Sequence, residues 1–111
     1  MKKALFTMFI LSIMLISCAP DKPSESLIQD LITKEYKNNV QRFDNVQLLN
    51  QWSDENEKGV YFIKVVYVDK IHSYLLKNHG EKIETIWKFK KEGNEWTPEN
   101  YKNTFIEVVP L

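Results

Sequence analysis

The chain has 111 residues, with 15 basic and 15 acidic side chains and a formal net charge of zero. This length supports one small domain rather than two. Both signs of charge are mixed along the chain, which argues against a nucleic-acid partner or a polybasic membrane patch, because both need clustered basic residues. Cys18 is the only cysteine, so no disulfide can form within the chain and the core alone must stabilise it.

The first eighteen residues have the composition of an export signal. Two lysines precede an uncharged, mostly apolar run over residues 4–16, and a small residue and a cysteine close it. This arrangement is typical of a secretory signal peptide. The run Leu-Ile-Ser-Cys at residues 15–18 resembles the lipobox of bacterial lipoproteins. The resemblance implies cleavage before Cys18 and attachment of lipid, such as palmitate, at Cys18.

An uncleaved membrane anchor is the alternative interpretation of this stretch. Residues 4–20 give 17 uncharged positions, the lower limit for crossing a hydrocarbon core of about 30 Å. Pro20 and Pro23 would end such a helix early. The lipoprotein interpretation predicts a signal peptide at 1–17, a lipidated cysteine with a short tether at 18–25, and a single domain at 26–111.

Lipid on Cys18 would hold the mature chain in the cell envelope, close to the bilayer because the tether is short. In a bacterium with two membranes we expect the outer membrane, facing the periplasm. With one membrane we expect the cell surface. The leader contains two of the basic residues, so the mature chain would have a formal net charge of −2.

Residues 26–38 predict an amphipathic helix. Ser26 and Gln29 fit a capping box at its start, and Asn38 with Asn39 is expected to end it. Apolar residues recur at helical spacing and form one stripe: Leu27, Ile28, Leu31, Ile32, Tyr36 and Val40. We interpret this segment as a core helix that packs on a sheet.

From residue 46 onward, the pattern is that of strands. Apolar and polar residues alternate over 46–52 and 83–89, whereas 60–68 and 105–109 are runs rich in β-forming residues. Gly59, Gly80 and Gly93 lie in polar breaks between these runs, which predicts hairpin turns with a residue at positive φ. Residues 71–76 are expected to continue the second strand past a bulge. The predicted fold is α+β, with one N-terminal helix packed on a curved antiparallel meander of four to five strands.

One helix followed by several strands, with a hairpin over residues 89–96, resembles the small cystatin-like and NTF2-like domains of bacterial lipoproteins. The resemblance covers residues 26–110 as a pattern of elements. NTF2-like domains usually have more helix before the sheet, whereas this chain has room for one long helix. Such folds often contain a pocket between helix and sheet, and a pocket here would be lined by Tyr36, Trp87 and Phe89.

No reactive set of residues is recognisable in the sequence. His72 and His79 are the only histidines and lie seven positions apart, so a single strand would place them on opposite faces. A zinc site needs three or four ligands, and we predict no metal. There is also no nucleophile elbow and no glycine-rich phosphate loop. We therefore predict a protein that is not an enzyme and binds no cofactor.

Residues 60–68 are apolar on both faces of the predicted strand, although one helix covers only one face. One face carries Tyr61, Ile63, Val65 and Tyr67, and the other carries Phe62, Val66 and Val68. We take Tyr61, Ile63, Val65 and Tyr67 as the uncovered set, and the hypothesis is that they bind a protein partner. The alternative is that the sheet curls over itself.

The sequence thus predicts a small lipid-anchored envelope protein that acts as a protein-binding module. Immunity lipoproteins, exclusion lipoproteins and accessory components of secretion or envelope systems are proteins of this kind. The alternative is a small-ligand carrier with a pocket between helix and sheet. No motif in the chain identifies the partner or the ligand.

Overall fold

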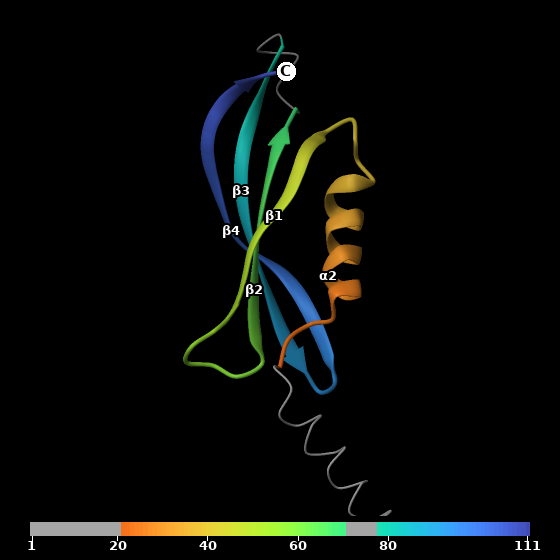
Figure 1. Cartoon of the computed structure of the whole chain (residues 1–111), viewed down its shortest axis with the longest axis vertical. Helices are drawn as coiled ribbons and strands as arrows, with labels where there is room; N and C mark the ends of the chain where they lie inside the picture. Colours follow the sequence, from red (N-terminus) through yellow and green to blue (C-terminus); the bar gives the residue numbers. More distant parts are fainter. Residues whose placement is uncertain (1–20, 71–77) are drawn as a thin grey trace, which may run out of the picture.

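The computed structural model describes residues 21–70 and 78–111, which form a helix packed on a four-stranded antiparallel sheet (Figure 1). Helix α2 (Glu25–Ile32) continues into the π-helical turn η1 (Thr33–Lys37). The strands are β1 (Phe43–Ser53), β2 (Val60–Asp69), β3 (His79–Glu92) and β4 (Glu95–Pro110). Their order in the sheet is β1-β2-β3-β4, so the predicted antiparallel meander is confirmed with four strands. Residues 71–76, expected to extend the second strand, lie outside the described residues.

The helix begins earlier than the sequence pattern predicts. Its N-cap is Ser24, whose Oγ accepts a hydrogen bond of 3.2 Å from the backbone N–H of Leu27. The predicted cap at Ser26 is therefore wrong, and so is the predicted boundary between tether and domain at residue 26. Pro23 is fully buried before the cap, which places the last residues of the predicted tether inside the fold.

The apolar stripe of the helix forms the core with one face of the sheet. Ile28, Leu31, Ile32 and Tyr36 are buried, and Leu27 is partly buried against them. Val40 was predicted to belong to this stripe, but it lies in the turn after the helix and is exposed. The helix ends at Asn38, whose N–H donates to the carbonyl of Thr33 at 2.8 Å, as the sequence predicts.

Two of the three predicted glycine turns are present. Gly59 ends the loop before β2 with φ of 74°, and Gly93 forms the turn between β3 and β4 with φ of 65°. Gly80 does not serve as a turn residue, because it lies inside β3. A Cβ at Gly80 would lie 2.7 Å from Cγ1 of Val68, so this glycine permits close packing of the neighbouring strand. Directly before β3, the residue with a positive φ is Asn78, at 63°.

The last strand is much longer than predicted. The run of β-forming residues indicates a strand only over residues 105–109, whereas β4 begins at Glu95 and pairs with β3 along its whole length. Two irregularities interrupt that register, next to Ile83 and next to Trp87. β4 is one edge of the sheet and β1 is the other, and both lie open along one side in the described part of the chain.

Candidate functional site

The four residues predicted to bind a partner lie in the core under the helix. Tyr61 and Tyr67 are each 7% exposed, and Ile63 and Val65 are 0% exposed. All four belong to the cluster that packs against α2. The expectation that this face of the strand is the uncovered one is therefore wrong, because the helix stripe occupies it. A partner cannot reach these side chains while the helix stays in place.

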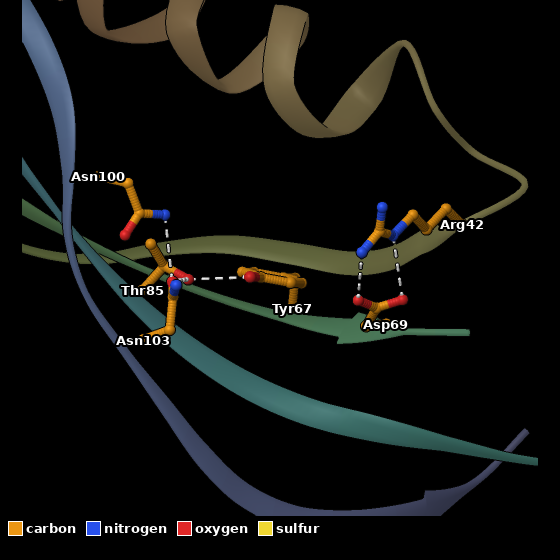
Figure 2. Close-up of polar contacts among 6 residues, drawn as sticks. All are labelled: Arg42, Tyr67, Asp69, Thr85, Asn100 and Asn103. Carbon is orange, nitrogen blue, oxygen red and sulfur yellow. Dashed lines mark hydrogen bonds and ion pairs between the residues drawn. The ribbon is translucent and has the colours of Figure 1, made fainter. Parts of the chain in front are cut away.

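Hydrogen-bonded polar side chains run through this core toward the edge strand (Figure 2). The hydroxyls of Tyr67 and Thr85 lie 2.8 Å apart, and Thr85 donates to Oδ1 of Asn103 at 2.8 Å. Because Thr85 gives its single proton to Asn103, the Tyr67 hydroxyl must donate to Thr85. The same Oδ1 accepts a second hydrogen bond of 3.2 Å from Nδ2 of Asn100. These bonds connect β2, β3 and β4 on the helix side of the sheet.

Tyr36 connects the helix to the same polar group. Its hydroxyl oxygen accepts a hydrogen bond of 2.7 Å from Nε1 of Trp87, and its ring lies 4.6 Å from that of Tyr67. Burial raises the pKa of Tyr36 to about 12, while the hydrogen bond that Trp87 donates partly opposes this rise. The phenol therefore remains neutral at physiological pH, and the described core contains no charge at this point.

The far end of the helix is held by an ion pair. Arg42 donates from Nε to Oδ1 of Asp69 at 3.3 Å and from Nη2 to Oδ2 at 3.2 Å, as Figure 2 shows. The guanidinium also lies 4.9 Å from the ring centre of Phe43. Asp69 is buried at the end of β2, so this two-point contact fixes the turn between helix and sheet. The ion pair between Arg42 and Asp69 therefore has a structural role, which is to hold this turn in place.

The opposite face of the sheet carries aromatic rings that the helix does not cover. Phe62 stacks on Trp52 with 5.4 Å between ring centres and contacts Tyr101 at the same distance. Nζ of Lys88 lies 5.5 Å from the centre of the Tyr101 ring. Phe62 itself is buried by these neighbours, whereas Tyr101 is more than half exposed. This face therefore offers Tyr101, rather than the β2 residues, to a partner.

Exposed apolar side chains gather on strand β4. Tyr101 and Phe105 are each 57% exposed, Val108 is 47% exposed and Ile106 is 41% exposed. With Leu111, they make five of the seven large apolar side chains that are exposed in the described part of the chain. We call Tyr101, Phe105, Ile106 and Val108 the β4 apolar edge. The sequence does contain a signal for it, because Phe105 and Ile106 are adjacent where a half-buried strand would alternate.

An open groove lies between the helix and the β3–β4 part of the sheet. It has a volume of about 400 Å³, and its apolar walls are Leu27, Leu31, Trp87 and Pro98. Of the three residues predicted to line a pocket, Trp87 does so. Tyr36 and Phe89 instead fill the core. The groove runs along the helix surface, past Leu27, Leu31 and Lys34.

The predicted lipidation site, Cys18, lies outside the described residues. In residues 21–70 and 78–111, no cluster of three or more potential metal ligands is present. Within the same residues, no helix has the length and apolar character needed to cross a membrane. The chain matches no protein-family model, no curated protein and no solved structure.

Proposed function

We propose that this chain is a lipid-anchored protein of the bacterial envelope that binds another protein. The anchor rests on the Leu-Ile-Ser-Cys run at residues 15–18, whose resemblance to a lipobox implies lipid on Cys18. Several acyl chains, at about 0.8 kcal/mol per buried CH₂, hold a protein stably on a bilayer, whereas one chain alone is marginal. The proposal that the domain binds a protein rests on a separate observation, made in the folded domain.

The observation that carries the binding proposal is the β4 apolar edge. Phe105, Ile106 and Val108 lie within four residues of one strand, whereas Tyr101 lies on the sheet face opposite the helix. Large exposed apolar patches are frequent at protein–protein contacts. Tyr101 and Phe105 suit a contact surface because aromatic rings bury large areas. β4 is also an edge strand, whose free backbone groups can pair with an extended segment of a partner.

The polar groups of the core support binding rather than catalysis. The buried hydroxyls of Tyr67 and Thr85 hydrogen-bond to each other, and Thr85 donates to Asn103 on the exposed edge strand. In the described part of the chain, no buried side-chain nitrogen or oxygen lacks a hydrogen-bond partner. Groups that are satisfied by their neighbours stabilise a unique packing, and they leave no free base or nucleophile directed at a substrate.

The experiment is capture of partners from envelope membranes with the lipidated protein as bait. Phe105→Ser should remove capture, because serine replaces one of the two exposed aromatic rings of the β4 apolar edge. Leu49→Ser is the matched control, since Leu49 is 55% exposed on the opposite edge strand, β1. If Leu49→Ser abolishes capture and Phe105→Ser preserves it, the binding surface is not on β4.

The second candidate function is small-ligand binding, and the groove beside Leu31 and Trp87 favours it. Apolar walls with charged residues nearby fit an amphipathic ligand, and here those residues are Asp30, Lys34 and Glu35. A ligand in the groove would change the fluorescence of Trp87. Leu31 and Trp87 also contribute to packing, so the variant to use is Pro98→Arg, which fills the groove from β4. Native mass spectrometry that finds no bound small molecule in the wild-type protein would remove this candidate.

A further inference from the structure

The chain that leads into the domain is held against it from Asp21 onward. Oδ1 of Asp21 lies 3.1 Å from Nζ of Lys91 in β3. Pro23 is less than 2% exposed, and Ser24 caps the helix. The exposed ion pair adds little, but the buried proline ring and the cap fix the path of the backbone. Residues 21–24 are thus part of the rigid body and do not act as a flexible tether.

These contacts lie at one end of the sheet. The start of α2, the turn of Gly93 between β3 and β4, and the loop between β1 and β2 share that end in Figure 1. The opposite end holds the turn that contains Gln41, together with the C-terminal residue Leu111. β3 has 14 residues, which at 3.3 Å per residue separates the two ends by about 45 Å.

We propose that the domain stands upright on the bilayer, with the Gly93 end facing the lipid and the Gln41 end facing away. This inference rests on lipid attachment at Cys18, as given under the proposed function. Only Ala19 and Pro20 separate Cys18 from Asp21, so the lipidated residue lies within about 11 Å of Asp21 even when the chain is fully extended. The surface of the lipid bilayer therefore lies next to this end of the domain.

Charge at the lipid-facing end favours contact through the acyl chains alone. Acidic residues there outnumber basic ones: Asp21, Glu25, Asp54, Glu55, Glu57, Glu92 and Glu95 against Lys22, Lys58, Lys90 and Lys91. Such an end gains nothing from anionic headgroups. The orientation should therefore form on uncharged phosphatidylcholine as well as on anionic bilayers.

The upright orientation places the β4 apolar edge away from the lipid. Phe105 pairs with Ile83 near the start of β3, and Val108 pairs with Glu81. Phe105 lies ten positions beyond Glu95, or roughly 33 Å along the strand from the lipid-facing turn. A partner can then approach the exposed rings from the surrounding compartment without touching the bilayer.

Energy transfer to the membrane surface tests the orientation. Cys18 is the only cysteine of the chain, so once it carries lipid a single introduced cysteine is the only thiol that a dye can label. Asn94→Cys and Gln41→Cys place the dye at exposed positions at the two ends. The full lipidated chain is bound to phosphatidylcholine vesicles that contain a headgroup-labelled acceptor lipid. We expect several-fold more efficient transfer from position 94 than from position 41.

Each outcome of this experiment decides one claim. Equal transfer from both positions while the protein floats with the vesicles shows a domain that lies flat or tumbles, which overturns the orientation and leaves the anchor intact. If the chain fails to float with the vesicles, or if Cys18→Ser floats equally well, the lipid anchor is overturned, and the orientation with it. Pro23→Gly should reduce the difference between the two positions without loss of flotation; an unchanged difference would overturn the role of the buried proline.

Discussion

The indole Nε1 of Trp87 donates a 2.7 Å hydrogen bond to the hydroxyl oxygen of Tyr36, joining β3 to the turn that ends the helix. The two residues are 51 positions apart. The rings also meet edge to face, with 6.4 Å between their centres. This contact fixes both the position and the rotation of the helix on the sheet, because an apolar stripe alone permits several rotations.

Tyr36→Phe should destabilise the domain by about 1–2 kcal/mol, because the indole N–H of Trp87 loses its acceptor while the ring volume is kept. Urea unfolding followed by Trp fluorescence measures the change. Tyr101→Phe is the control, since it removes a hydroxyl from a ring that is largely exposed, and it should change the free energy of unfolding by less than about 0.5 kcal/mol. Equal effects of the two variants would contradict a specific role for the Tyr36–Trp87 bond.

Alkaline pH should weaken the fold through Tyr36. Burial raises the pKa of this phenol from 10.0 to about 12, so folding favours the neutral form. Below pH 10, the pKa of the phenol in the unfolded chain, burial of the neutral phenol contributes fully to the free energy of unfolding. This contribution is lost as pH rises from 10 toward 12. The loss amounts to up to about 2–3 kcal/mol.

The measurement for this pH effect is the urea midpoint of the wild-type protein and of Tyr36→Phe, followed from about pH 8 to about pH 12. Lysines and other tyrosines titrate in both proteins and cancel in the difference. The stability advantage of the wild-type protein should shrink as pH rises. Two curves that remain parallel across this range would show that the raised pKa of Tyr36 does not contribute.

Gly80→Ala should destabilise the domain by about 1–3 kcal/mol through overpacking. The added methyl group would lie 2.7 Å from Cγ1 of Val68 and 3.1 Å from both the Asp69 carbonyl oxygen and Cδ2 of Leu111. Gly93→Asn is the control, because the turn is open to solvent and asparagine tolerates positive φ. Thermal melts of both variants provide the comparison, and a larger loss for Gly93→Asn would contradict the packing argument.

Much of the fold could be predicted because local signals agree with it. The stripe of Ile28, Ile32 and Tyr36 has helical spacing, and Gly59 and Gly93 take the positive φ that tight turns require. The start of the helix could not be predicted from its pattern. Ser24 and Ser26 are both good caps, and burial of Pro23 in the tertiary structure selects the first of them.

The candidate site was the harder part to predict. Both faces of β2 are apolar, so the alternation of side chains cannot reveal which face the helix covers, and the set containing Tyr61 and Tyr67 was assigned to the wrong side. The first half of β4 is rich in Asn, Lys, Thr and Glu, which conceals a strand held by pairing with β3. The exposure of Phe105 depends on that pairing and on the lack of a further strand beside β4 in the described part of the chain.

Removal of residues 21–24 should weaken the domain, although they were predicted to be tether. A chain that begins at residue 25 lacks the Ser24 cap, which costs about 1 kcal/mol, and it also lacks the buried Pro23. The measurement is the melting temperature of a chain that begins at residue 21 and of a chain that begins at residue 25. Both should unfold cooperatively and independently of reductant, because no disulfide is involved. Identical melting temperatures would place residues 21–24 outside the folded unit.

Substitutions in the core and on the β4 apolar edge should have opposite effects on stability and binding. Tyr67→Ala removes a ring that packs on Tyr36 and lies 5.2 Å from the ring centre of Phe43, and it should cost about 3–5 kcal/mol. Phe105→Ser changes an exposed side chain, so the free energy of unfolding should change by about 0.5 kcal/mol or less, while partner capture weakens by upwards of about 1 kcal/mol.

Urea unfolding and binding titrations on the same two variants decide between these roles. A folded Tyr67→Ala protein that retains the wild-type affinity would confirm that this face of β2 serves packing alone. A large loss of stability in Phe105→Ser would instead mean that β4 needs its apolar side chains for folding. Its exposed rings would then be structural, and the partner would have to bind at another surface, such as the groove beside Leu31 and Trp87.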